Sequence, residues 1–130
     1  GCIAMLDLDH FKRVNDRFGH AGGDAVLQHF ATLVSGRLRE GDMLARIGGE
    51  EFAVLLPGAS MTSAHTVLER IREGLRASVV PLGGGGCSIT LSGGVARYTA
   101  RTTVVEAMAE ADAALYRAKQ GGRDRLALAA

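Results

Sequence analysis

Two adjacent glutamates stand in the middle of an apolar stretch, where a metal ion or a charged ligand could use them. The stretch of residues 45–58, ARIGGEEFAVLLPG, has the pattern of two short strands joined by a tight turn. Glycine pairs accept the positive φ angles of such turns, so the sequence predicts a hairpin. The glycines also remove side chains from the turn, leaving room for a ligand. The predicted hairpin therefore presents Glu50 and Glu51 at an uncrowded tip.

A second pair of acids ends the first apolar run of the chain. Residues 2–9, CIAMLDLD, have the pattern of a strand buried on both faces. Taken alone, Asp7 and Asp9 are most simply interpreted as solvated acids at a strand end, and we expect only one of them to join a given site directly. If this strand lies beside the hairpin, Asp7 meets Glu50. Two hard oxygen donors at a sheet edge suit Mg²⁺, which binds through one or two carboxylates plus substrate phosphates.

The remaining segments supply the elements that would position these acids. Helices are expected at residues 10–20, stopped by Gly19, then from Asp24 as an N-cap onward, at 62–77 and at 103–120. Further strands are expected at residues 43–47, 51–57, 78–82 and 87–98, with 125–129 closing the sheet and the glycine run 83–86 as a hairpin loop. Helices alternate with strands, and hairpins are present, so the fold class is α+β: a central, mostly antiparallel sheet flanked by helices.

Composition sets limits on the class of protein. The chain has 130 residues, enough for one domain, with a formal net charge of +1. This charge gives no bulk electrostatic reason to bind a nucleic acid polymer or an anionic membrane. Cys2 and Cys87 have no metal-ligand spacing, so we expect buried thiols in a reducing compartment and a cytoplasmic location. The chain opens inside an apolar strand, so we expect a fragment of a longer protein, which could be membrane-anchored through its missing N-terminal region.

Four ordered segments carry a resemblance to a known family. They are DLDHFKRVNDRFGHAGGD, RIGGEEF, TLSGGVA and ADAALYRAKQGGR, and they extend over residues 7–123. Together they resemble the signature blocks of the GGDEF family, the diguanylate cyclases. The resemblance implies one GGDEF domain over residues 1–130, with a fold similar to nucleotidyl cyclases and polymerase palms. It also implies a homodimer in which two GTP-loaded domains make cyclic di-GMP and two pyrophosphates.

The resemblance assigns metal and catalytic roles. Asp7, the Leu8 carbonyl and Glu50 match the ligands of two Mg²⁺ ions, with Mn²⁺ as a possible substitute. Such ions neutralise phosphate charge and lower the pKa of a bound hydroxyl. Glu50 and Glu51 are the expected catalytic residues. Glu51 matches the second acid of the signature and would orient the attacking hydroxyl or accept its proton.

The same resemblance outlines a GTP site. Asn15 and Asp24 match the pair that reads guanine, and a carboxylate can accept hydrogen bonds from guanine N1–H and N2–H. Without the family, Asn15 would be a helix-surface residue and Asp24 an N-cap, a role compatible with guanine binding. The full expected set for GTP is Phe11, Lys12, Asn15, Asp24, Gly49, Lys119 and Arg123. Its basic members would balance the triphosphate charge, and backbone N–H groups near Phe11 and Lys12 would suit the terminal phosphates.

A second site is implied ahead of the hairpin. Arg39 and Asp42 form an RxxD string, and five residues separate Asp42 from Gly48. This spacing matches that of the family's inhibitory product site. Arg70 matches the additional arginine of that site. An RxxD string alone usually marks a surface turn, whereas an arginine fork can pair with guanine edges or phosphates of cyclic di-GMP.

Two departures from the family pattern leave alternatives open. The usual helix and its LTGLxNRR-like segment before the first strand are missing, which puts the stability and full activity of the fragment in doubt. Asp124 replaces a usual Asn beside the phosphate-binding residues and would weaken nucleotide binding slightly. The main alternative to a cyclase is a module that binds GTP or cyclic di-GMP without turnover. A third reading is a cyclase for another nucleotide, which Asn15 and Asp24 argue against. A sensory or regulatory domain is expected upstream.

Overall fold

The structure is a computed structural model that describes residues 1–130, and its elements alternate along the chain. The strands are β1 (Cys2–Leu8), β2 (Met43–Gly48), β3 (Glu51–Leu56), β4 (Val80–Leu82), β5 (Gly85–Cys87), β6 (Leu91–Arg97) and β7 (Arg125–Leu128). The helices are α1 (Phe11–Ser35), α2 (Met61–Ala77) and α3 (Val104–Gln120). No helix is long and apolar enough to cross a membrane.

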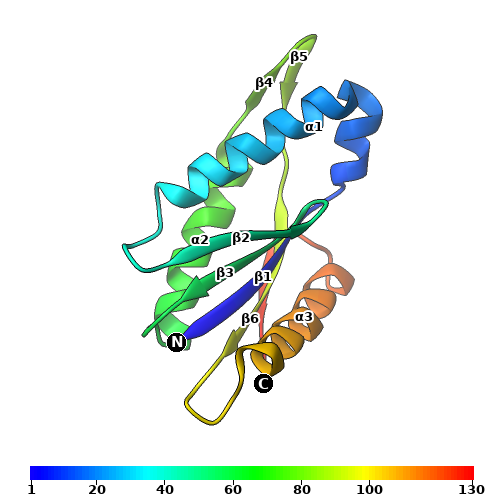
Figure 1. Ribbon diagram of the computed structural model, residues 1–130. Helices are drawn as coiled ribbons and strands as arrows, with labels where there is room; N and C mark the ends of the chain where they lie inside the picture. Colours follow the sequence, from blue (N-terminus) through cyan, green and yellow to red (C-terminus); the bar gives the residue numbers. More distant parts are fainter.

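The main sheet has five strands in the order β2-β3-β1-β6-β7. All pairs are antiparallel except β6 with β7, which is parallel. The β1 strand therefore lies in the centre, with the β2–β3 hairpin on one side and β6 on the other, as Figure 1 shows. The predicted α+β class with a mostly antiparallel sheet is confirmed.

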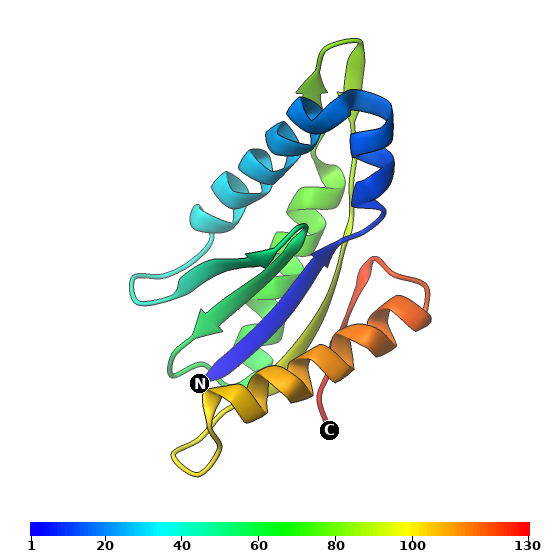
Figure 2. The same cartoon turned by 45° about the vertical axis from the view of Figure 1, so that its right-hand side comes forward.

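Side chains alternate along a strand, so those on the two faces of β1 pack into two separate hydrophobic cores. Ala4, Leu6 and Leu8 join a large core under α1 and α2. Ile3 and Met5 join a smaller core under α3. Figures 1 and 2 show the resulting layers, with α1 and α2 on one side of the sheet and α3 on the other. Asp7 follows Ile3 and Met5 in this alternation, so its side chain is on the α3 side.

Helix α3 comes close to the sheet because both surfaces are built from small residues. Its buried positions include Ala107, Ala111, Ala114 and Ala118. A Cβ added at Gly94 of β6 would overlap the Ala111 carbonyl oxygen and the Leu115 backbone nitrogen. The glycine pair in TLSGGVA therefore permits a close approach that any larger residue would prevent.

Helix α1 is bent where the sequence predicted a break. Gly19 has φ +75° and ψ 178°, a non-helical conformation inside the helix, so the chain forms two helical arms. The second arm resumes immediately after Gly19 instead of at Asp24. The prediction that Asp24 caps this arm is wrong, because Asp24 lies within helical backbone and its side chain makes no capping hydrogen bond.

The segment after α2 also differs from the expected pair of strands. The predicted strand at residues 87–98 is split into β5 and β6 by residues 88–90, which belong to no strand although the Thr90 carbonyl oxygen accepts from the Asp9 N–H at 2.8 Å. The β4–β5 pair forms a separate two-stranded hairpin that extends past the end of the main sheet beside the bend of α1 (Figure 2). The glycine run at 83–86 makes its turn, as predicted.

Candidate functional site

The end of the sheet brings together acids that are far apart in the sequence. In the β1–β3 register, Asp7 lies opposite Glu51, and the Leu8 N–H donates to the Glu50 carbonyl oxygen at 3.2 Å. Gly49 and Glu50 form the two-residue turn between the paired residues Gly48 and Glu51, with Gly49 at φ +51°. The hairpin thus delivers both glutamates to the end of β1, as the sequence predicted.

The carboxylates at this sheet end are electrostatically crowded. Burial raises the pKa of Asp7, and the neighbouring Glu50 and Asp9 carboxylates add to that increase, while Lys119 opposes it. Burial likewise raises the pKa of Glu51, helped by the carboxylates of Asp112 and Asp7. A bound divalent cation would relieve this repulsion, so the residues fit a hard metal ion such as Mg²⁺.

The protein offers few side chains that could bind a metal ion at this sheet end. No group of three or more His, Cys, Asp or Glu side chains is arranged to hold a metal ion. The Leu8 side chain is 1% exposed and belongs to the core, so Leu8 can contribute only its backbone. Asp7, Glu50 and a carbonyl would leave coordination positions open. Such a donor set suits a Mg²⁺ ion that completes its shell with water and substrate phosphates.

A cavity of about 340 Å³ opens beside Glu50. It contains five residues predicted to bind GTP, and its walls come from both arms of α1 and from the β2–β3 hairpin. The lining residues are Phe11, Lys12, Asn15, His20, Asp24, Leu27, Arg46, Gly49 and Glu50. The structure therefore brings the expected guanine-reading pair and one expected metal ligand to the same cavity.

Two glycines explain how Asn15 and Asp24 reach one cavity. The bend at Gly19 turns the second arm of α1 back, so that residues nine positions apart line the same space. Gly23 then makes room, because a Cβ at this position would overlap Asn15 Oδ1. The packing of the cavity wall therefore requires a glycine at position 23, the second glycine of the HAGGD segment.

The basic residues predicted to contact phosphates are split between two places. Lys12 lines the cavity, whereas Lys119 Nζ lies 2.7 Å from Asp7 Oδ2. Arg123 does not line the cavity; it lies in the turn after α3, with φ +65°. Lys119 thus places a cation directly at the acidic sheet end.

The turn that carries Arg123 is held in an unusual conformation. Gly122, Arg123 and Asp124 all have positive φ angles, of 122°, 65° and 45°. Residues other than glycine pay roughly 1–3 kcal/mol for such backbone, so surrounding contacts must hold it. The Asp124 N–H donates to Asp9 Oδ2 at 2.9 Å, and Arg72 of α2 pairs with the Asp124 carboxylate at 2.8 Å.

Asp9 is a residue that the sequence interpretation misjudged. It is 3% exposed instead of solvated. Its carboxylate accepts hydrogen bonds from Ser92 Oγ at 2.6 Å, Thr90 Oγ1 at 2.7 Å and the Asp124 N–H. Asp9 therefore ties β1, β6 and the turn after α3 together, while Asp7 alone faces the acidic site. The polar side chains of Thr90 and Ser92 in an apolar strand were the signal that could have revealed it.

Asp124 also has a role that the sequence did not predict. Its carboxylate is paired with Arg72 and lies 3.6 Å from Arg76 Nε, so its charge is compensated by α2. The expectation that Asp124 weakens nucleotide binding slightly stays a prediction.

The predicted inhibitory residues lie at the other end of β2. Asp42 Oδ2 accepts from the Arg39 N–H at 2.8 Å and lies 3.5 Å from Arg39 Nε. The Arg39 side chain is 62% exposed and that of Asp42 is 2% exposed. Asp42 therefore caps the turn, and Arg39 presents its guanidinium to solvent. Arg70 of α2 is exposed and makes no hydrogen bond or ion pair, so its link to Arg39 stays a prediction.

Comparison with known proteins assigns this arrangement to one family. The family model "Diguanylate cyclase, GGDEF domain" matches residues 1–125. The chain is 46% identical over 127 residues to diguanylate cyclase DgcP of Pseudomonas aeruginosa, covering 98% of this chain and 19% of DgcP. It therefore spans about a fifth of the length of that relative.

Solved structures give the same result. Diguanylate cyclase SiaD of P. aeruginosa, determined in complex with its activator SiaC, superposes with a TM-score of 0.94 at 44% identity, over 98% of this chain and 49% of SiaD. The GGDEF domain of DgcB from Caulobacter crescentus, in complex with c-di-GMP, superposes with a TM-score of 0.93 at 37% identity, over 98% of this chain and 74% of that one. The sheet-end acids, the two-armed helix and these matches show that the chain belongs to the GGDEF family of diguanylate cyclase domains.

Proposed function

We propose that this domain condenses two molecules of GTP into cyclic di-GMP and releases two pyrophosphates. The observation that carries the proposal is the junction at the sheet end. There, Asp7 and Glu50 adjoin the cavity that contains Asn15 and Asp24, and Lys119 adds a cation. The residues proposed to read guanine, to bind metal and to bind phosphate are thus adjacent. Family membership supports the same activity.

The cavity wall supports recognition of guanine over adenine. The Asp24 carboxylate can accept from guanine N1–H and N2–H, whereas adenine N1 is itself an acceptor. The Asn15 amide can both donate and accept at the base edge. A polar site that engages every group of one base can reject another by up to about 10⁴–10⁵.

Asp7, Glu50 and the Leu8 carbonyl are proposed to hold divalent metal, most simply two Mg²⁺ ions with Mn²⁺ as a substitute. When bound, the metal would neutralise phosphate charge and lower the pKa of the attacking hydroxyl. The protein's own part is to place these acids by strand register. Lys119, Lys12 and Arg123 are proposed to balance the triphosphate.

The reaction requires each 3′-oxygen to attack the α-phosphate of the other nucleotide. One P–O bond forms and one breaks at each phosphorus atom, and each pyrophosphate leaves with the electron pair. The 3′-hydroxyl proton goes to a base or to solvent. Glu51 is the proposed acceptor, because its raised pKa moves it towards the range in which a general base works near neutrality.

We call the cavity beside Glu50, lined by Asn15 and Asp24, the guanine cavity. Because this chain has one such cavity and the product has two guanosines, we expect two domains to meet face to face. We therefore propose a catalytic homodimer, which an upstream domain would help to assemble. The exposed Arg39 with Asp42 and Arg70 is proposed to bind the product. This RxxD turn lies at the other end of β2 from Glu50, roughly 17 Å away at strand rise. Product bound there would hinder assembly and would not compete with GTP.

The alternative, a module that binds these nucleotides without turnover, is less favoured because both acids of the signature are present and lie at the end of β1. One experiment separates the possibilities. The purified chain is incubated with GTP and Mg²⁺, and separately with ATP, over a range of protein concentrations, and products are identified by chromatography and mass spectrometry. Cyclic di-GMP from GTP, with specific activity that rises with protein concentration, supports the proposal. Bound but unchanged GTP at every concentration supports the binding module, and a cyclic product from ATP supports a different cyclase.

A further inference from the structure

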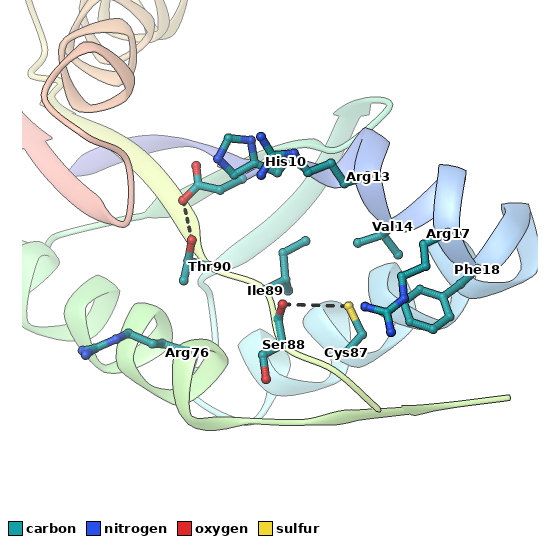
Figure 3. Close-up of a pocket in the computed structure, with 11 residues that line it drawn as sticks. His10, Arg13, Val14, Arg17, Phe18, Arg76, Cys87, Ser88, Ile89 and Thr90 are labelled. Atoms are coloured by element: carbon teal, nitrogen blue, oxygen red, sulfur yellow. Dashed lines mark hydrogen bonds between the residues drawn. The ribbon is translucent and has the colours of Figure 1, made fainter. Parts of the chain in front are cut away.

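A second hollow lies on the other side of the first arm of α1 from the guanine cavity. It has a volume of about 440 Å³ and is walled by that arm, by the C-terminal part of α2 and by the segment that joins β5 to β6 (Figure 3). Its lining residues are Asp9, His10, Arg13, Val14, Arg17, Phe18, Arg76, Cys87, Ser88, Ile89 and Thr90. None of them lines the guanine cavity. We call this space the basic hollow.

The charges around the basic hollow are unevenly compensated. Arg76 is paired with Glu73 at 3.3 Å and lies near Asp124. The Asp9 carboxylate is occupied by its three donors. Arg13 and Arg17, in contrast, take part in none of the chain's ion pairs, so neither has a carboxylate within 4.0 Å.

These two arginines lie one helical turn apart, so they face the same side of α1. Like charges at this spacing destabilise a helix. Arg76 lines the opposite wall, but its guanidinium is directed away from these two arginines (Figure 3). A bound anion would relieve this repulsion, and arginine is the side chain whose planar fork best matches phosphate.

The rest of the lining suits an organic ligand with an apolar or aromatic body. Val14, Phe18 and Ile89 provide the apolar part of the wall, and the Arg17 guanidinium lies 4.9 Å from the centre of the Phe18 ring. Ser88 is exposed and offers a hydroxyl. The volume falls in the range of small-molecule sites, about 300–1,000 Å³.

We infer that the basic hollow binds a phosphate-bearing small molecule of mononucleotide size, at a site separate from the guanine cavity. Arg17 holds the phosphate at the end away from Asp9, whose negative charge would repel it, and Arg13 contacts the ligand from the His10 end of the hollow (Figure 3). The body of the ligand packs against Phe18 and Ile89. The alternative is an ordinary solvated helix face, whose arginines recognise nothing.

The test uses the ¹⁵N-labelled chain without metal, with AMP and adenosine as probes. Adenine lacks the donor edge that Asn15 and Asp24 are proposed to read, so AMP avoids the guanine cavity, and the result does not depend on the proposed function. Backbone amide shifts of Ser88 and Ile89 report the basic hollow, and those of Gly49 and Asp24 report the guanine cavity. We expect saturable shifts at Ser88 and Ile89 with AMP and at least about tenfold weaker binding of adenosine.

Substitution of the two arginines tests whether they bind the phosphate of AMP. Arg17→Gln and Arg13→Gln should each weaken AMP binding by about tenfold, the effect of losing a hydrogen bond to a charged group. Arg101→Gln is the matched control, because Arg101 is exposed and distant in the loop before α3, and it should bind AMP as the wild type does. All three arginines are exposed, and a circular dichroism spectrum confirms the fold of each variant. Absence of saturable shifts at Ser88 and Ile89, equal binding of AMP and adenosine, or unchanged affinity in both hollow variants would overturn the inference.

Discussion

Lys119 of α3 donates to Asp7 at the end of β1, with Nζ 2.7 Å from Oδ2, across 112 positions of sequence. This ion pair makes a predicted phosphate-binding cation and a predicted metal ligand direct neighbours. It depends on Asp7 sharing the α3 side of the sheet with Ile3 and Met5. The small residues of α3 and β6, which let the helix approach the sheet, are therefore part of the site's construction.

Removing the Lys119 charge should affect both GTP binding and the titration of Asp7. We expect Lys119→Gln to raise the KM for GTP by about tenfold, the loss of one charge-assisted contact. Lys119 lowers the pKa of Asp7 against the effect of burial, so the acidic limb of the pH–rate profile should move to higher pH. Initial rates over GTP concentration and pH provide both readouts. Arg117→Gln on the same helix, whose guanidinium donates to the Leu128 carbonyl at 2.9 Å, should leave both unchanged; an equal effect there would refute the specific pairing.

Asp9 should prove a positioning residue for the turn that carries Arg123. Asp9→Ala leaves the Thr90, Ser92 and Asp124 donors without their acceptor, and we expect a loss of about 1–3 kcal/mol in the free energy of unfolding. The KM for GTP should also rise, because the strained turn loses its anchor. Asp9→Asn keeps one oxygen acceptor, so it should recover part of the lost free energy of unfolding and part of the change in KM.

Urea unfolding and GTP kinetics of these variants provide the measurements. Asp16→Ala, at an exposed position of α1 without a side-chain partner, is the control and should change stability by less than about 0.5 kcal/mol. If Asp9→Ala matched this control in stability and KM, the three hydrogen bonds would have no positioning role.

Several of these features could be predicted from the sequence, because they depend on local pattern. The GGE turn, the break at Gly19 and the existence of helices on either side of it and at residues 62–77 and 103–120 follow from glycine conformations and apolar periodicity. The meeting of Asp7 with the hairpin glutamates followed once β1 was placed beside β3. The GTP-binding roles came from the family resemblance and not from spacing.

Other features depend on contacts between segments that are distant in the sequence, so the local sequence pattern could not predict them. The burial of Asp9 requires Thr90, Ser92 and the turn at Asp124 to arrive from two other elements. The sequence pattern predicted Asp24 as an N-cap, because a helix can begin at a polar residue that follows glycines. In the structure the second arm begins one turn before Asp24, directly after Gly19. The pairing of Asp124 with Arg72 joins positions 52 apart.

Gly23 should be required for nucleotide binding rather than for folding. In Gly23→Ala the new methyl group collides with Asn15 Oδ1, so the asparagine must leave its place in the cavity. We expect at least about tenfold weaker GTP binding by calorimetry. The far-UV circular dichroism should be retained, because alanine favours helix. Gly36→Ala is the matched control, since its nearest added contacts are ordinary, at 3.6 Å and beyond. Unchanged GTP affinity in Gly23→Ala would remove Asn15 from the site.

The RxxD turn should be tested through Arg39, since Asp42 caps the turn and its removal would disturb the backbone. We expect Arg39→Ala to lower the affinity for cyclic di-GMP by roughly 1.5–3 kcal/mol, the value of hydrogen bonds to charged groups. GTP turnover measured before product accumulates should be nearly unchanged, and inhibition of the wild type should be non-competitive with GTP. Titration calorimetry with both proteins measures the affinity. Equal affinities would leave the RxxD string as an ordinary surface turn.

The proposed activity depends most on the metal-binding acids at the sheet end, and Glu50→Gln changes one of them while keeping its size. The most direct measurement is the initial rate of cyclic di-GMP formation from GTP and Mg²⁺ by the wild type and by Glu50→Gln, at equal protein concentration. We predict cyclic di-GMP from the wild type, with two pyrophosphates for each product molecule, and a rate at least about 10²-fold lower from the variant. The variant should still show a cooperative thermal unfolding transition. A folded Glu50→Gln protein that makes cyclic di-GMP at nearly the wild-type rate would contradict the account.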